Sequence, residues 1–364
     1  NNVAIGVQAL QTNTTGSDNV AIGLDTLYSN TTASQNTGVG YNALYSNSTG
    51  AQNTSVGYQS LLLNTTATYN TAVGHQALKL TTTGQYNTAT GGLALEKNTT
   101  GEFNSSYGLN SMNANTTGSN NTGYGAYSLY SNTTASYSTA VGKNAAYSTT
   151  TSSQGVTVVG SDALYQNTTG TDIVAMGRAA LYNNTTGNNN VALGRSALQS
   201  NTTASSNTAV GYQAAYSNTT GSANNAFGTS ALYTNTTGSQ NVAMGNNTLD
   251  NNTTGSYNVA LGNQALGANT TASYNSALGH LALNANTTGV SNVAVGYGAL
   301  ASNTTANSNT AMGVNALTAN TTGAENVALG QQALDNNTTA NNNTSLGYQA
   351  GYSNTTGSNN TAVG

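Results

Sequence analysis

The sequence has 364 residues, of which only 4% are charged, and five basic and nine acidic side chains give a net charge of −4 at pH 7. So weak and scattered a charge excludes the electrostatic footprint of a protein that binds nucleic acid or an anionic membrane. The chain contains no cysteine, which excludes disulfides and thiolate chemistry, and no apolar run approaches the roughly 20 residues that a membrane helix needs.

A 17-residue repeat runs through the whole chain. Its marker glycine falls at Gly6, Gly23 and Gly40 and continues at equal steps to Gly364, except that the interval between Gly142 and Gly160 is longer by one position. The repeat reads N-[VT]-A-[VIL]-G-x-x-A-L-x-x-N-T-T-[GA]-S-x and covers residues 1–364. We therefore predict one continuous array, and because the chain begins and ends inside a repeat we expect it to be a piece of a longer protein.

Each repeat begins with a short segment in which β-branched or aliphatic residues alternate with alanine, as at 3–5 and 20–22. That alternation is typical of a strand, and the glycine and the N-T-T-G stretch that follow are turn formers. No part of a repeat is long enough for a helix. The pattern predicts an all-β fold, a parallel β-solenoid (β-roll or β-helix) with one 17-residue coil per repeat and about 21 coils stacked at about 4.7–4.9 Å.

The stacking converts each sequence column into a column in space. We predict that the aliphatic residue before the glycine and the leucine after it form the core, at Ile5, Leu10, Ile22, Leu27, Val39, Leu44, Leu193 and Leu198. Identical charges one coil apart would repel, whereas identical asparagines can hydrogen-bond along the stack. The leading asparagines are therefore predicted to form a ladder, at Asn2, Asn19, Asn36 and Asn53.

The middle residue of the strand is alanine in most repeats, and where it is not alanine it is almost always another small residue. Ala209 and Ala243 are examples. Persistent smallness predicts that another chain, or another wall of the same coil, packs closely against this column. The first alternative favours self-association of the chain as a homotrimer or a filament.

Three stretches carry a resemblance to a known family: NNVAIGVQA at 1–9, DNVAIGLDT at 18–26 and NNVALGRSA at 189–197. They resemble the head repeats of trimeric autotransporter adhesins, which implies a left-handed parallel β-roll in which three chains associate side by side. The inserted N-T-T-G-S turn departs from the shorter repeat of that family. Arrays of this longer type also look like the shafts of phage tail fibres and like large bacterial surface proteins.

One repeat, around 143–160, is irregular. It is one position longer than the others, and its leucine position is taken by Ala146. We expect the extra residue to bulge in the turn at 152–155 while the core column stays aligned from Leu129 through Ala146 to Leu164. Charged residues gather nearby, so a partner site is the alternative.

The few titratable residues are too dispersed for catalysis or metal binding. His75 and His280 share a column but lie 12 repeats apart, and no carboxylates recur in register. We predict that the chain is not an enzyme and takes no metal and no cofactor. The N-T-T triplets are formal glycosylation sequons, so candidate sites are Asn13, Asn30, Asn98 and Asn201, and a plain asparagine turn is the alternative.

These features together predict a non-enzymatic structural fibre or stalk of an extracellular filament or surface adhesin. Such a segment spaces or displays binding tips, and adhesion along its length to a host or surface receptor is a further expectation. A phage tail-fibre shaft is one alternative. An ice-binding solenoid, which would use the threonine column of the N-T-T turns, is an alternative of another class. The expected location is the cell surface, the extracellular space or a virion tail, with no nucleic-acid partner and no membrane insertion of this segment.

Overall fold

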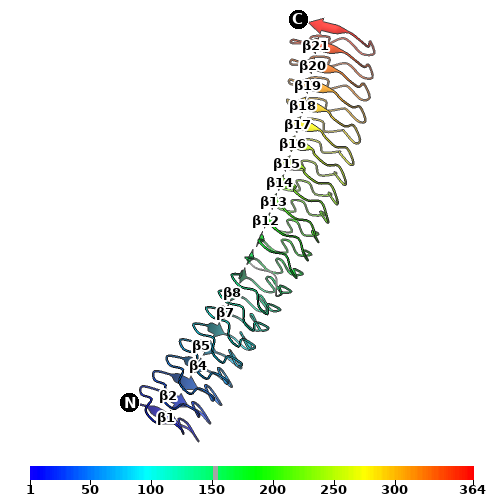
Figure 1. The fold of residues 1–364 in the computed structure, drawn as a ribbon. Coiled ribbons are helices and arrows are strands. Elements are labelled where there is room, and N and C mark those ends of the chain that lie inside the picture. Colours follow the sequence, from blue (N-terminus) through cyan, green and yellow to red (C-terminus); the bar gives the residue numbers. More distant parts are fainter. Residues whose placement is uncertain (151–154) are drawn as a thin grey trace. The chain divides into compact units, whose positions relative to one another are not determined.

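The computed structural model describes residues 1–150 and 155–364. The described residues form 22 three-residue strands and no helix, and the strands pair in parallel from coil to coil (Figure 1). The chain divides into two compact units, residues 1–186 and 187–364, and each is a stack of coils. The prediction of an all-β parallel solenoid of about 21 turns with a 17-residue spacing is confirmed.

Every repeat contributes one strand, which occupies the three residues before the marker glycine. In unit 1 the strands are β1 (Val3–Ile5), β2 (Val20–Ile22), β3 (Thr37–Val39), β4 (Thr54–Val56), β5 (Thr71–Val73), β6 (Thr88–Thr90), β7 (Ser105–Tyr107), β8 (Thr122–Tyr124), β9 (Thr139–Val141), β10 (Thr157–Val159) and β11 (Val174–Met176). In unit 2 they are β12 (Val191–Leu193), β13 (Thr208–Val210), β14 (Asn225–Phe227), β15 (Val242–Met244), β16 (Val259–Leu261), β17 (Ser276–Leu278), β18 (Val293–Val295), β19 (Thr310–Met312), β20 (Val327–Leu329), β21 (Thr344–Leu346) and β22 (Thr361–Val363).

Within each unit, the backbone of a coil is hydrogen-bonded to the next coil on all of its sides. In the sheet, Val3 pairs with Val20, its counterpart in the next repeat. Away from the sheet, the Leu27 amide donates to the Ala43 carbonyl at 3.0 Å, and the Thr31 amide donates to the Ser48 carbonyl at 3.1 Å. The short strands are therefore only one part of a continuous ladder, which satisfies backbone groups that would otherwise be buried without partners.

The interior of a coil is narrow, and one leucine fills most of it. Leu27, Leu44 and Leu198 are fully buried, so the prediction that they belong to the core is confirmed, whereas Leu10 in the first coil is half-buried. A Cβ atom added to Gly38, the middle residue of β3, would lie 2.6 Å from the Thr26 methyl group and 3.6 Å from Leu27 Cδ1, which is already van der Waals contact with the leucine. Only a small residue fits opposite the leucine, and this is why the middle of the strand is alanine, glycine or serine in nearly every repeat.

These leucines adopt a backbone conformation that leucine normally avoids. Leu27 has φ 52° and Leu44 has φ 54°, both in the left-handed region. For a residue other than glycine this conformation costs about 1–2 kcal/mol. Burying a leucine side chain contributes about 1.5–3 kcal/mol, so the packing in the coil interior offsets the backbone cost.

Two columns of asparagine form ladders inside the coils. In the first, the Asn36 amide donates to Asn19 Oδ1 at 3.0 Å, and the Asn53 amide donates to Asn36 Oδ1 at 2.9 Å. Asn2 accepts in the same way from the Asn19 amide, at 2.9 Å. The predicted ladder of Asn2, Asn19, Asn36 and Asn53 is therefore confirmed, and all but the terminal Asn2 are buried.

The second ladder is built from the first residue of each N-T-T turn. Asn47 Nδ2 donates to Asn30 Oδ1 at 3.0 Å and also to the Gly50 carbonyl at 2.9 Å. One side chain thus links two coils and closes the turn of its own coil. Buried amides are stable only when they are hydrogen-bonded in this way, so a polar column in the core acts as a coil-to-coil fastener.

The first ladder changes character near the irregular repeat. Its positions there are Ser138, Val156 and Ile173, and all three are buried. Two adjacent apolar residues remove the need for a partner on both sides, and replacing both partners of a hydrogen bond by apolar groups is nearly neutral. Val156 and Ile173 therefore belong to the core, and they do not contribute to a partner site.

The extra residue of the irregular repeat falls between Thr150 and Val156. The Thr150 amide donates to the Thr168 carbonyl, one position beyond the regular offset of that bond, whereas the Thr157 amide donates to the Ile173 carbonyl with the regular offset. The predicted bulge at 152–155 lies almost wholly outside the described residues.

The core column continues through the irregular repeat as predicted. Leu129, Ala146 and Leu164 are all fully buried. The backbone keeps them in line as well, because the Leu129 amide donates to the Ala145 carbonyl and the Ala146 amide donates to the Ala163 carbonyl, both at 3.0 Å. The extra residue is therefore absorbed without displacing the interior of the coil.

Candidate functional site

The titratable side chains do not come together. Among residues 1–150 and 155–364 no group of three or more histidines, aspartates or glutamates is arranged to hold a metal ion. The His75 ring stacks on Tyr58 at 5.2 Å, and the His280 ring stacks on Tyr297 at 5.5 Å. Both histidines therefore take part in aromatic columns on the surface of their own units.

Two carboxylates lie partly buried beside the core leucines of unit 2. Desolvation raises the pKa of Asp250, and hydrogen bonds from the backbone at Asp250 and Asn251 oppose that rise. Desolvation likewise raises the pKa of Asp335, and a hydrogen bond from the Thr318 side chain opposes it. Neither carboxylate belongs to a cluster of titratable groups among the described residues, so these shifts report local burial.

The third residue of each strand points outward. We call this set the strand-face column. Ile5 and Ile22 are 59% and 37% exposed, and Val39 and Leu193 are only half-buried. The prediction that Ile5 and Ile22 lie in the core is therefore wrong, and Val39 and Leu193 do not fill the coil interior either. The physical reason is the narrowness of the coil, which admits only the small middle residue of the strand.

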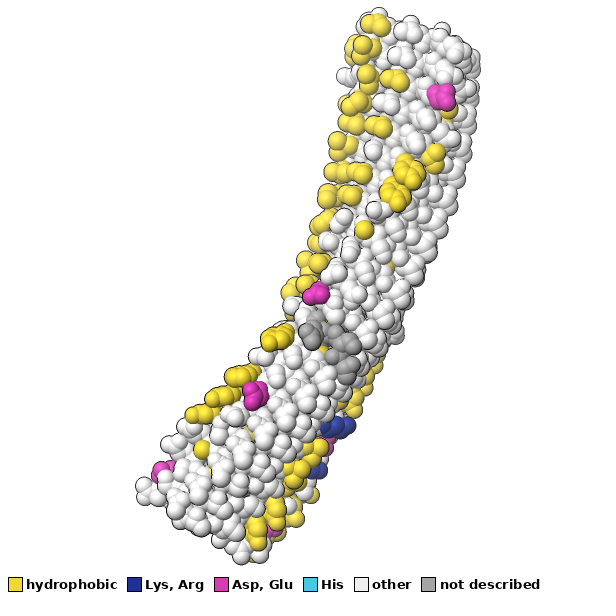
Figure 2. All heavy atoms as spheres, viewed as in Figure 1, with side chains coloured by type: hydrophobic (Ala, Val, Ile, Leu, Met, Phe, Trp, Pro, Cys, Tyr) yellow, Lys and Arg dark blue, Asp and Glu magenta, His cyan; other side chains and the backbone are white. Residues whose placement is uncertain are grey.

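The strand-face column is apolar in all eleven strands of unit 2. Leu278 and Leu346 are each 50% exposed, and Met312 is 45% exposed. Figure 2 shows this as a stripe of hydrophobic side chains along the edge formed by strands β12–β22. With coils at about 4.8 Å, eleven strands make a stripe about 50 Å long. Contiguous apolar surface of this extent is typical of an interaction site.

The middle alanines face the opposite way and are covered by their own coil. Ala209 and Ala243 have no exposed surface. Of the two alternatives for this column, another chain or another wall of the same coil, the structure supports the second. Self-association therefore draws no support from the alanines.

The variety of the strand-face column is the signal that sequence reasoning missed. It holds Thr90, Tyr107 and Phe227 as well as aliphatic residues. An interior position of fixed volume does not accept residues of such different sizes. The middle position, with its uniformly small residues, has the signature of the interior instead.

Aromatic side chains form short stacks along three columns of the surface. The longest joins Tyr130, Tyr147, Tyr165 and Tyr182, with ring centroids 5.0, 5.0 and 5.1 Å apart. Desolvation, followed by the neighbouring phenols, raises the pKa of Tyr147. Because consecutive rings cover each other's faces, these stacks offer mainly ring edges to an incoming molecule.

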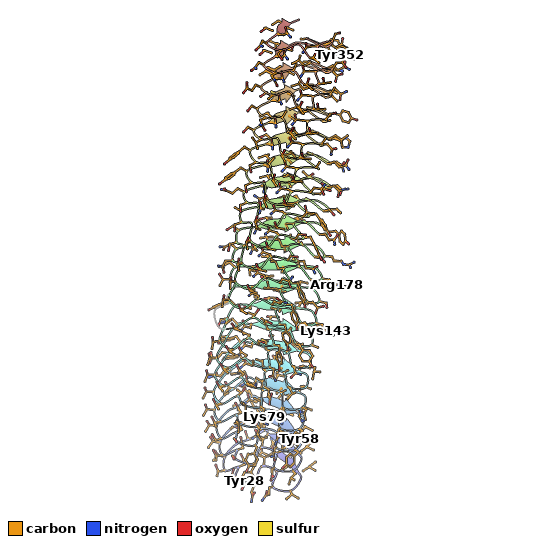
Figure 3. All side chains as sticks on the ribbon, turned by 90° about the vertical axis from the view of Figure 1, so that its right-hand side faces the viewer. Tyr28, Tyr58, Lys79, Lys143, Arg178 and Tyr352 are labelled. Carbon is orange, nitrogen blue, oxygen red and sulfur yellow. The ribbon has the colours of Figure 1, made fainter. Side chains whose placement is uncertain are left out.

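Three of the five cationic side chains occupy the position directly after the marker glycine, which we call the rim column. Lys143 and Arg178 project from the side of unit 1 on the same side as Tyr58, which belongs to that column as well (Figure 3). In unit 2 the Arg195 guanidinium lies 5.8 Å from the centre of the Tyr212 ring. The rim column accepts long and charged residues because it faces solvent.

The asparagines of the N-T-T sequons are engaged in the second ladder. Asn30, Asn98 and Asn201 have no exposed surface, and Asn13 in the first coil is half-buried with its Nδ2 donating to the Gly16 carbonyl at 3.0 Å. A glycan on Asn30, Asn98 or Asn201 would have to occupy the coil interior. The burial of these three amides favours the alternative of a plain asparagine turn, and Asn13 uses its amide in the same way.

The burial of the sequons leads to an expected result in glycosylation assays. Oligosaccharyltransferase incubated with the folded chain should leave Asn30, Asn98 and Asn201 unmodified, because their amides are inaccessible. Exposed Asn120 and Asn342, which also begin Asn-X-Thr sequences, serve as the internal control. Peptide mass spectrometry measures the occupancy. Modification of Asn98 at the level found for Asn120 would contradict the buried ladder.

No helix among the described residues has the length and apolar character needed to cross a membrane. The repeat that makes the coils is simple, and its resemblance to other arrays rests on a few residues per repeat. Comparison with known proteins finds no family model that matches this chain and no curated protein that matches its sequence.

Proposed function

We propose that this chain is a non-enzymatic structural segment of an extracellular fibre, either a stalk of a bacterial surface adhesin or the shaft of a phage tail fibre. Its role is to space and display other parts of the fibre. The resemblance of its strand segment to the head repeats of trimeric autotransporter adhesins supports this role, as does the coil-to-coil fastening by backbone and asparagine ladders.

The single observation that carries the proposal is the strand-face column. A solitary soluble solenoid has no reason to display an aliphatic side chain on nearly every strand of unit 2, since exposed apolar area favours contact with another surface. Lateral association of copies of the chain, as a homotrimer or a filament, would cover this stripe. A fibre made of several chains is stiffer than one solenoid, which suits a spacer.

The test is the mass of the chain in solution. We expect light scattering after size-exclusion chromatography to give a multiple of the 36.5 kDa chain mass. Replacing Met244, Leu278 and Met312 together by lysine should weaken association about tenfold or more, because each ammonium group would lose its hydration in the contact between chains. These positions lie two coils apart, so the new charges do not stand in adjacent coils.

The matched control places lysine in the same three coils but in the rim column, at Asn246, His280 and Val314. That column already accepts lysine at Lys143 and arginine at Arg178. The control should associate like the unmodified chain. A strictly monomeric unmodified chain, or equal weakening by both triple variants, would overturn the proposal.

A further inference from the structure

Unit 2 carries a periodic array of hydroxyl groups that the fibre role leaves unused. It is made by the second threonine of each N-T-T turn and by the serine two residues later, and we call it the hydroxyl face. Five consecutive coils have both residues: Thr203 and Ser205, Thr220 and Ser222, Thr237 and Ser239, Thr254 and Ser256, and Thr271 and Ser273. The threonines are exposed, the serines are half-buried, and the glycine or alanine between them is buried.

The two threonines of each turn differ in what their hydroxyls do. The first donates to the next coil, as Thr219 Oγ1 does to the Thr236 carbonyl at 2.9 Å. The hydroxyls of Thr220, Thr237 and Thr254 make no hydrogen bond to any described residue and face solvent. The identity of the second threonine is thus not explained by a bond inside the protein, although it is threonine in all 21 N-T-T-type turns of the sequence.

The serines are held in register by the backbone. The Ser222 amide donates to Ser239 Oγ at 3.1 Å, and the Ser239 amide donates to Ser256 Oγ at 3.0 Å. The Ser239 hydroxyl has only a long contact of 3.4 Å to the Thr237 carbonyl for its own hydrogen. The oxygen positions are therefore fixed, and each serine is partly accessible to solvent.

The geometry of this face suits a ligand that is itself flat and periodic. The columns repeat at about 4.8 Å along the stack. Within each coil only the buried glycine or alanine separates the threonine from the serine. Small ligands bind in concave pockets, and the described residues form no such pocket. No charged side chain interrupts the two columns between Thr203 and Ser273. No strongly hydrated group therefore disturbs the water next to this face.

We propose that the hydroxyl face binds the surface of ice. The oxygen atoms of an ice face lie in parallel rows, and their repeat along a row is close to the coil-to-coil spacing of the array. Each threonine offers a hydroxyl that can replace a lattice water and a methyl group that orders the waters around it. The five consecutive coils would bind ice cooperatively, because their hydroxyl groups contact the same ice surface at the same time.

A crystalline polysaccharide is also flat and periodic, but the aromatic rings beside the hydroxyl face are poorly placed for it. Sugar rings pack against open faces of aromatic side chains. Tyr257 and Tyr274, which follow the serines of two coils, stack on each other with centroids 5.1 Å apart and planes 5° apart. Each ring therefore covers one face of its neighbour, and the observations favour ice.

The experiment uses the full chain with a fluorescent label. We expect it to be incorporated into a growing ice hemisphere and to inhibit ice recrystallisation. Replacing both Thr220 and Thr254 by lysine should raise the concentration needed to inhibit recrystallisation at least tenfold. Each long charged side chain would keep the ice surface away from the neighbouring hydroxyl groups. Lysine at Thr229 and Asn263, two exposed rim-column positions also two coils apart, is the matched control and should leave inhibition unchanged.

Circular dichroism spectra that match the unmodified chain would show that the variants are folded. Exclusion of the unmodified chain from ice, or equal loss in the Thr220/Thr254 variant and its control, would overturn the inference. Binding to insoluble cellulose or chitin without any effect on ice would also overturn it, in favour of a polysaccharide ligand. The Met244/Leu278/Met312 variant is assayed alongside, so that failure to associate is distinguished from failure to bind ice.

Discussion

Replacing Gly91 by alanine should locally disrupt the solenoid, whereas the same change at the adjacent Gly92 should be nearly neutral. Gly91 has φ 137°, and a Cβ atom there would lie 2.5 Å from the carbonyl oxygen of Gly108 in the next coil. A conformation that only glycine adopts readily costs another residue about 1–3 kcal/mol, and the clash with backbone adds to this. We expect a total loss of about 3 kcal/mol or more in the free energy of unfolding.

Gly92 provides a control in the neighbouring position. Its added Cβ would meet only the Leu109 side chain, at an ordinary 3.4 Å, and the rim column to which it belongs holds many larger residues. Coils of a solenoid open locally, so hydrogen exchange of residues 74–125 is the measurement, with thermal unfolding beside it. Similar hydrogen exchange in both variants would show that the close approach between backbones of adjacent coils does not require glycine at the marker position.

The second large effect concerns the asparagine ladder, where two substitutions should change stability in opposite directions. The ladder is interrupted at Thr81, and there Asn64 Oδ1 and Thr81 Oγ1 are buried without a hydrogen-bond partner among the described residues. Thr81→Asn restores the missing amide and should stabilise the chain by about 1–3 kcal/mol, the cost of leaving such a group unpaired. The measurement is the midpoint of denaturant unfolding.

The reverse change, Asn252→Thr, should destabilise the chain by about 2–4 kcal/mol. Asn252 Nδ2 donates to Asn235 Oδ1 at 2.8 Å and to the Gly255 carbonyl at 3.0 Å, and its Oδ1 accepts from Asn269 at 2.8 Å. Exposed Asn263→Thr is the control and should stay within about 0.5 kcal/mol of the unmodified chain. If Thr81→Asn destabilised the chain instead, the unpaired Asn64 Oδ1 and Thr81 Oγ1 would not be what limits stability at this coil.

The period of the repeat was enough to predict the coil, the parallel register and the leading asparagine ladder. These depend only on equal coil length, because residues one repeat apart then lie above one another whatever the cross-section of the coil. The asparagines of the N-T-T turns recur almost as regularly, but the sequence left open whether they form a second ladder or lie at the surface. Its asparagines begin turns, and a turn former such as Asn30 is normally placed at the surface, where it would also serve as a glycosylation site. Its burial follows from the inward direction of the amide toward the Ala33 carbonyl, 3.0 Å away.

What the sequence by itself determined about this protein is its one-dimensional order: one coil for each repeat, a leucine in the core of most coils, and a stack nearly free of charge. What only the tertiary structure decided is which side of each strand faces inward. Hydropathy favours Ile22 over Ala21 as the buried residue, yet Ala21 is buried and Ile22 is exposed. The alternation of a strand is symmetric between its two faces, and the choice depends on the volume left inside the coil once Leu27 has filled it. That volume is set by where the opposite wall lies, which is a property of the closed coil and of no single segment.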